Sequence, residues 1–255
     1  MNPEYLERGY FVLKSLFSPD ELGSLHSVLQ DFHSAWLRDN TEAYQNGVLN
    51  SAYLTGPRYL GTEQRMLLFQ FIARRRLMDV LATVIPDNPA FMNTQLFFNP
   101  SNPQQRNYWH RDVQYTGLSV AEQKVVLSSS NVVHFRIPLT PELGLELVPG
   151  SHRAWDSAEE FAVRTEHHGR KCFEDLASGQ AVALQPGDLL VFSANMIHRG
   201  LYGLDRFALD ILFCDMDPDL LKYAEPDCLP DAADLHTLEN SVAFANTRKL
   251  IAANP

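Results

Sequence analysis

The chain has 255 residues, of which 45% are hydrophobic and 20% are charged, and its formal net charge is −10. This length allows a sizeable hydrophobic core and is within the range of a single all-β domain. The acidic balance argues against nucleic acid as a partner, because phosphates need basic side chains, and against an anionic membrane surface.

The cysteine content and the N-terminal residues predict the compartment. Cys172, Cys214 and Cys228 are odd in number and lack the CxxC spacing of metal and redox motifs. They are therefore expected to be free thiols in a reducing environment. The first residues lack the basic and apolar segments of a signal peptide, and no window approaches 18 apolar residues. These features predict a cytoplasmic protein that is not bound to a membrane.

Residues 1–90 predict a mainly helical region with one strand. The aromatic and β-branched run at 9–13 favours a strand. Ser18 and Pro19 then mark a helix start, because serine caps helices and proline is tolerated at the first helical position. The polar, glycine-containing stretch 38–62 predicts a long loop, which is often a functional lid. Residues 63–85 predict helix again, with a turn near its arginines.

From residue 91 onward, short strand-like runs replace the helical pattern. Many short strands without helices between them are typical of a sandwich or barrel. The segment 154–178 is expected to be part helix and part loop, and the acidic segment 216–255 is expected to be a tail that wraps the barrel and is partly disordered. We therefore expect one domain, mainly β with flanking helices, whose core spans 91–215. The expected strands are 91–98, 108–115, 131–139, 145–148, 181–184, 189–193 and 206–214.

Two histidines and one aspartate suggest a metal site. His110-Arg111-Asp112 is the one His-x-acid match in the chain, and about one is expected by chance, so the spacing alone carries little information. On a strand, however, residues i and i+2 project to the same side. His198, after the apolar run 189–193, is a candidate third ligand, although a surface histidine is the alternative. Two histidines and a carboxylate on one face of a metal are the ligands of non-haem Fe(II) oxygenases.

Arg206 stands at the head of an apolar strand, so its guanidinium is expected to face either a barrel mouth or solvent. An inward guanidinium needs an anionic partner, because an unpaired buried charge is costly. Its planar fork suits a carboxylate held through two hydrogen bonds.

Four blocks of the chain resemble the phytanoyl-CoA dioxygenase family of Fe(II)/2-oxoglutarate-dependent oxygenases. They occur in the order found in that family. The third block, which contains the sequence PGSH, is the most distinctive of the four. The blocks are residues 5–22, Tyr108–Asp112, Gly144–His152, and 186–198 together with Arg206.

The resemblance implies a double-stranded β-helix, or jelly-roll, core of the cupin type. It implies Fe(II) held by His110, Asp112 and His198, with 2-oxoglutarate chelating the iron and its far carboxylate on Arg206. Gln95 stands where relatives often place a polar contact to the co-substrate. By the same analogy, His152 is a structural residue near the site.

The chain also departs from the family pattern. Gly200 stands two residues after the distal histidine, where relatives often carry a serine or threonine that touches the co-substrate. Arg136 stands where relatives often carry an aromatic residue. Arg136 and Arg199 are rival candidates for the far carboxylate of 2-oxoglutarate.

The implied function is hydroxylation of an unactivated C–H bond of a small molecule, with conversion of 2-oxoglutarate and O₂ to succinate and CO₂. A carboxylate at Asp112 favours hydroxylation over halogenation, since halogenating relatives have a small residue there. Whether the substrate is free or linked to coenzyme A or a carrier stays open.

Two alternatives remain. A cupin-like dioxygenase or isomerase that does not use 2-oxoglutarate predicts a further histidine near the first ligand pair, where His134 is the nearby spare, and an Arg206 that faces solvent. A non-catalytic jelly-roll binding protein predicts that a metal ligand has been lost.

Overall fold

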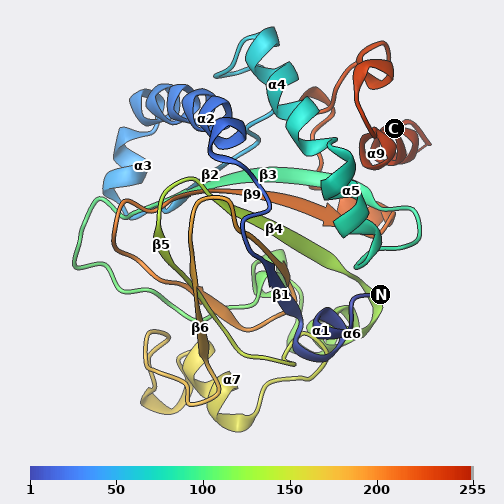
Figure 1. The fold of residues 1–255 in the computed structure, drawn as a ribbon. Coiled ribbons are helices and arrows are strands. Elements are labelled where there is room, and N and C mark those ends of the chain that lie inside the picture. The colour runs from blue at the N-terminus through green and yellow to red at the C-terminus, as the bar shows by residue number, and fades with distance from the viewer. Residues whose placement is uncertain (254–255) are drawn as a thin grey trace.

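The computed structural model describes residues 1–253, and its centre is a pair of antiparallel sheets (Figure 1). The larger sheet has the order β1-β7-β4-β9-β3-β2, and the smaller has the order β6-β5-β8. The strands are β1 (Tyr10–Leu13), β2 (Asn50–Ala52), β3 (Ala90–Phe98), β4 (Val132–Pro138), β5 (Glu142–Leu147), β6 (Gln180–Leu184), β7 (Leu189–Ser193), β8 (His198–Gly200) and β9 (Phe207–Cys214).

Helices cover the outer face of the larger sheet. Figure 1 shows α2, α4, α5 and α9 on one side of β3, β9 and β4, with β5 and β6 on the other. The α-helices are α1 (Pro3–Arg8), α2 (Pro19–Asp39), α3 (Thr41–Gln45), α4 (Thr62–Ile72), α5 (Arg75–Ala82), α6 (Val120–Ser129), α7 (Ala158–Arg164), α8 (Pro218–Leu221) and α9 (Val242–Ala253). Short 3₁₀ turns are η1 (Asp112–Thr116), η2 (His167–Gly169), η3 (Pro226–Cys228) and η4 (Asp234–Thr237).

The predicted start of α2 is confirmed. The Ser18 hydroxyl accepts a hydrogen bond from the backbone N–H of Glu21, and the Glu21 carboxylate accepts one from the N–H of Ser18. This capping box satisfies two backbone donors that the helix itself cannot pair.

The two faces of β4 and β9 have different chemistry, because side chains alternate along a strand. Val133, Phe135 and Ile137 of β4 pack into the main hydrophobic core with the helices. The alternate residues His134 and Arg136 are buried on the opposite face and line a cavity. A sheet whose inner face carries buried charged residues needs partners for them, which indicates a functional interior.

The segment 108–115, predicted as a strand, is not one. His110 forms a single bridge with His198, and the chain then enters η1 at Asp112. Arg111 explains the departure, because its guanidinium is fully buried and donates to the carbonyls of Ser151 and Asn195, which are distant in the sequence. The prediction that the motif residues project from one strand was therefore wrong.

Three other segments contain more structure than the sequence predicted. The segment 38–62, expected to be a loop, contains α3 and the edge strand β2, so the N-terminal region has two strands. Helix α6 precedes β4. The described part of the C-terminal segment contains α8, η3, η4 and α9, and the ring of Phe244 in α9 lies 4.7 Å from that of Phe91 in β3.

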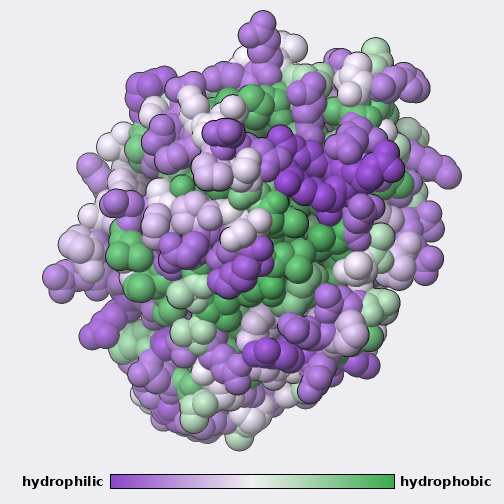
Figure 2. Space-filling view, viewed as in Figure 1, coloured by the Kyte–Doolittle hydropathy of each residue, from purple (hydrophilic) through white to green (hydrophobic). Residues whose placement is uncertain are grey.

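Within residues 1–253, no helix is long and apolar enough to cross a bilayer. Figure 2 shows a mostly hydrophilic face with hydrophobic residues gathered near its middle, around β1.

Candidate metal centre and co-substrate cavity

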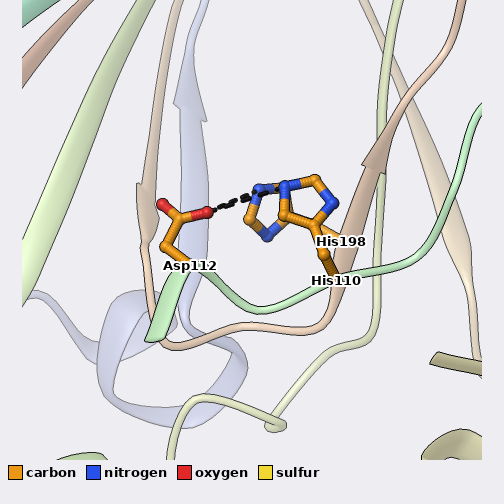
Figure 3. Close-up of side chains that lie close together, drawn as sticks. All are labelled: His110, Asp112 and His198. Carbon is orange, nitrogen blue, oxygen red and sulfur yellow. Dashed lines mark ion pairs between the residues drawn. The ribbon is translucent and has the colours of Figure 1, made fainter. Parts of the chain in front are cut away.

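His110, Asp112 and His198 converge at one point, as Figure 3 shows. The Asp112 Oδ1 atom lies 3.6 Å from Nε2 of His110 and 3.6 Å from Nε2 of His198. Nitrogen and oxygen ligands about 2.1 Å from a common metal, at right angles to one another, are separated by about 3 Å. The three side chains are therefore close to the arrangement that a shared metal ion requires.

Backbone pairing fixes the two histidines relative to each other. The N–H of His110 donates to the carbonyl of His198, and the N–H of His198 donates to the carbonyl of His110, each at 2.9 Å. The ring centroids lie 4.2 Å apart. Asp112 then follows in η1, whose first turn directs its carboxylate toward both rings. A single bridge and a tight turn thus replace the strand that the sequence predicted.

Both histidines present Nε2 to the centre. The Nδ1 atom of His110 lies 3.2 Å from the carbonyl oxygen of Tyr108, and that of His198 lies 3.0 Å from the carbonyl oxygen of Met196. A carbonyl can only accept a hydrogen bond, so Nδ1 carries the proton and Nε2 keeps its lone pair. Burial lowers the pKa of His110, and burial followed by repulsion from His110 lowers the pKa of His198 to about 3. Both imidazoles are therefore neutral, as metal ligands must be.

Asp112 is held ionised by its neighbours. Burial alone would raise the pKa of this carboxyl, but the hydrogen bond from His134 and the adjacent histidines bring its pKa below the ordinary value. His134 is the cation here, since hydrogen bonds to Asp112 and Asp210 outweigh burial and raise its pKa to about 9.

A chain of buried ion pairs continues from His134. Its Nδ1 atom lies 3.1 Å from Asp210 Oδ2, and Asp210 Oδ1 accepts a hydrogen bond from Arg136 at 2.8 Å. Arg136 also donates two hydrogen bonds of 2.8 Å to Glu142. Arg136 is thus bound by two carboxylates, which leaves it little capacity for a further anion.

Arg206 lies beyond this series of ion pairs and is less well paired. Its Nη1 donates to the carbonyl of Phe98 at 3.2 Å, and its Nε stays 3.9 Å from Glu142 Oε2. Within residues 1–253 the buried Nε has no hydrogen-bond partner. Burial, together with repulsion from Arg136, lowers the pKa of Arg206 to about 10. A buried guanidinium in this state favours the arrival of an anion.

Arg199 points away from the centre. Its guanidinium donates to Glu146 and Asp175 and stacks on the Trp109 ring at 4.5 Å. It lies between His198 and Gly200 on β8, so strand alternation directs it to the other face of the smaller sheet.

The metal triad and Arg206 share one cavity of about 530 Å³ between the two sheets. Its volume is in the range of about 300–1,000 Å³ that is usual for small-molecule sites. The candidate residues Gln95, Arg136 and Arg206 all line it. Within residues 1–253, the side chain of Gln95 makes no hydrogen bond, so its amide is available to a ligand.

The sequence did not predict the two buried partners of Arg136. Asp210 carried a usable signal, because a lone acid in an apolar strand must be paired when buried. Glu142, which follows a proline at the start of β5, carried none. His134 was noted only as a spare histidine, and its position between two carboxylates depends on the register of β4 against β9.

Several solved structures share this fold. EctD from S. alaskensis, in a structure with 2-oxoglutarate and 5-hydroxyectoine, has a TM-score of 0.59 at 18% identity, over 86% of this chain and 80% of that chain. HygX from Streptomyces hygroscopicus, with iron bound, has a TM-score of 0.58 at 13% identity, over 84% and 86%.

The non-heme alpha ketoglutarate dependent carbocyclase SnoK from nogalamycin biosynthesis has a TM-score of 0.52 at 17% identity, over 84% of this chain and 82% of that chain. These likenesses confirm the predicted jelly-roll class.

No curated protein sequence matches the chain. The sequence profile of one family, phytanoyl-CoA dioxygenase (PhyH), matches residues 5–201. That match covers more than half of the chain and includes the three residues of the metal triad. The chain belongs to the phytanoyl-CoA dioxygenase family.

Proposed function

We propose that this protein is an Fe(II)- and 2-oxoglutarate-dependent dioxygenase that hydroxylates a C–H bond of a small molecule. Fe(II) is held by His110, Asp112 and His198, and the far carboxylate of 2-oxoglutarate by Arg206. The observation that carries the proposal is the incompletely paired guanidinium of Arg206 in the same cavity as the metal triad. EctD, one similar structure, was solved with 2-oxoglutarate and another time with bound Fe.

The residues fit both groups. Two neutral imidazole nitrogens and one carboxylate oxygen are the donor set of non-haem Fe(II) oxygenases, which leaves positions open for a co-substrate and O₂. When bound, the iron supplies the oxidising chemistry, and the protein supplies orientation and electrostatics.

Each residue of the cavity then has a defined task. Arg206 attracts and orients the dicarboxylate, and Gln95 offers it a hydrogen bond. His134 donates to Asp112 Oδ2, so that Oδ1 faces the metal position. The apolar walls exclude water from the reacting C–H bond.

Hydroxylation is the reaction that we assign within this family. Similar structures include a carbocyclase and an epimerase, so the fold alone does not select it. With iron bound, the carboxylate of Asp112 would fill a metal position that a halide could otherwise take. Incorporation of one oxygen atom from isotope-labelled O₂ into the product would support hydroxylation, whereas a cyclised or epimerised product without that label would contradict it.

The cupin-like alternative predicted a further histidine near the first ligand pair. His134 is the histidine in that place, but both of its ring nitrogens are directed to carboxylates. Arg206 is 4% exposed and does not face solvent. Both observations favour the use of 2-oxoglutarate.

Calorimetric titration of 2-oxoglutarate into the Fe(II)-loaded protein under argon tests the assignment. Arg206→Met should weaken binding by about 100-fold, since it removes a charge-assisted pair in a buried site. Arg199→Met is the matched control, because Arg199 is buried and paired on the other face of the sheet, and it should leave the affinity unchanged. Equal affinities for wild type and Arg206→Met would overturn the assignment.

A further inference from the structure

The cavity has a charged end and an uncharged end. Following the inner face of the larger sheet away from Arg206, the cavity-lining residues are first Arg136 and Asp210 and then His134, which contacts the ligand Asp112. The charged residues of the lining thus lie at the Arg206 end and at the metal level. Beyond His134 the described lining contains no charged side chain.

The uncharged end is formed by six segments that lie in different parts of the sequence. β4 and β9 contribute apolar residues, and the bulge of β3 contributes another together with an asparagine. Helices α6 and α8 and the segment after β2 complete the wall. These lining residues are Ala52, Tyr53, Met92, Asn93, Val126, Ser130, Val132, Leu212, Leu220 and Tyr223.

Two tyrosines form the rim of this end. Tyr53 and Tyr223 are each 37% exposed, and the Tyr53 hydroxyl donates to the carbonyl of Tyr223 at 3.4 Å. Their rings offer flat apolar surface beside the opening. The neighbouring charges, Lys222 and Glu225, are exposed to solvent and do not line the cavity.

Asn93 supplies one directed polar group. Its Oδ1 accepts from the N–H of Tyr53 at 3.2 Å and from the N–H of Thr94 at 2.7 Å. These two donors fix the amide orientation, because only the oxygen can accept. Its Nδ2 is left as a donor with no partner in residues 1–253, on a residue that lines the cavity and is 7% exposed.

We infer that the substrate is an uncharged, mainly apolar molecule that accepts a hydrogen bond from Asn93. The inference rests on the proposed function, which assigns the charged end to iron and 2-oxoglutarate. A charged group placed in the uncharged end would lose hydration without gaining a counterion, which is costly. The phosphates of a coenzyme A thioester do not fit this end, because phosphate recognition needs arginine or lysine.

Three probes with one ring system test the class. Methyl naphthyl ketone is neutral and has one acceptor oxygen, naphthoate is anionic, and naphthylmethylammonium is cationic. Each is titrated by calorimetry under argon into protein with Fe(II) and saturating 2-oxoglutarate. The ketone should bind at least about tenfold more tightly than either ion, because the ions lose hydration in a wall without charge. An ion that binds as tightly as the ketone, or a ketone that does not bind, would overturn the inference.

Asn93→Asp sharpens the test. The aspartate keeps both accepted hydrogen bonds but replaces the free donor by a carboxylate. Ketone affinity should fall by about tenfold, since a donor is lost and a charge is introduced, while the ammonium probe should become the tightest ligand. Asn240→Asp is the matched control, because Asn240 Oδ1 accepts from the N–H of Val242 at the start of α9, outside the cavity. It should leave the order of the three probes unchanged.

The visible spectrum, recorded on the same samples, tests the co-substrate assignment separately from the substrate class. A charge-transfer band that needs Fe(II) and 2-oxoglutarate, combined with a preference for an ion, would leave the proposed function intact and refute the substrate class. A preference for the ketone without any band would support the substrate class and refute the co-substrate assignment.

Discussion

His134 Nε2 lies 2.9 Å from Asp112 Oδ2, on the carboxylate oxygen opposite the one that faces the two imidazoles. One oxygen of Asp112 is thereby held by a buried cation, and the other is left for a metal. Because His134 is held in turn by Asp210, the position of the candidate metal ligand depends on the inner face of the larger sheet.

Replacing His134 should weaken metal binding without removing a ligand. We expect His134→Leu to lower Fe(II) affinity by about 10- to 100-fold, because partners that orient metal ligands typically have this effect. His134→Gln can still donate a hydrogen bond to Asp112, so its Fe(II) affinity should fall less. The measurement is anaerobic calorimetry with Fe(II).

His168→Leu, at an exposed histidine of η2, serves as the control and should bind Fe(II) as the wild type does. An unaltered Fe(II) affinity in folded His134→Leu would show that Asp112 needs no support from His134.

Gly200 leaves space that Arg206 occupies. A Cβ atom at Gly200 would lie 2.7 Å from Arg206 Nη2 and 3.4 Å from its Cζ. Because Arg206 is buried, a shift of its guanidinium would disturb its hydrogen bond to the carbonyl of Phe98. Gly200→Ala should therefore weaken 2-oxoglutarate binding by about tenfold and leave Fe(II) affinity unchanged.

The control for this prediction is Gly23→Ala in α2, where an added Cβ would meet no atom within 4 Å. It should stabilise the helix by up to about 1 kcal/mol and leave 2-oxoglutarate binding as it was. Wild-type co-substrate affinity in Gly200→Ala would mean that the Arg206 guanidinium is not fixed by this contact.

The ion pair between Arg136 and Glu142 is fully buried, and it should be costly to break from one side. Arg136→Met leaves Glu142 without this cation and should lower the free energy of unfolding by about 3–5 kcal/mol. The double change Arg136→Met/Glu142→Met should cost less than the sum of the single changes, because no lone charge at these two positions stays buried. Urea unfolding of Arg136→Met, Glu142→Met and the double variant measures these three costs.

Arg75→Met removes one partner of the exposed pair with Glu239 and should change the unfolding free energy by less than about 0.5 kcal/mol. Strictly additive costs at Arg136 and Glu142 would contradict the ion-pair interpretation.

His152 should make stability depend on pH. Burial, followed by repulsion from Arg153, lowers the pKa of His152 to about 4, whereas the unfolded chain keeps the ordinary value near 6.5. Between these values the unfolded state binds a proton that the folded state does not, so stability falls as the pH is lowered from about 6.5 to 4. His152→Gln should reduce this slope by up to about 1.4 kcal/mol per pH unit. Urea unfolding of both proteins across this range checks it, and identical slopes would contradict it.

Local signals in the sequence predicted those parts of the structure that depend on neighbouring residues. The helix start predicted at Ser18 is confirmed, and Glu21 completes a capping box there, since a cap needs only residues three apart. Most strands of the core were found because their apolar runs are bounded by turns, whereas the short β8 was not predicted. The run 108–115 failed because the long-range contacts of Arg111 override its strand-like composition.

The candidate site was predictable in its residue types but not in its pairing. His110, Asp112 and His198 were found by spacing and resemblance, and the structure brings them together. Which arginine is left for an anion could not be read from the sequence. That depends on Glu142 and Asp210, which bind Arg136. Asp210 is 74 positions from Arg136 in the sequence, and the register of β4 against β9 brings the two together.

The most direct test of the account is the visible spectrum of the protein under argon, first with Fe(II) and then with 2-oxoglutarate. We expect a weak charge-transfer band that needs both additions and is absent in Arg206→Ala. Bound Fe(II) without such a band in the wild type would contradict the use of 2-oxoglutarate, and an undiminished band in Arg206→Ala would contradict the role of Arg206.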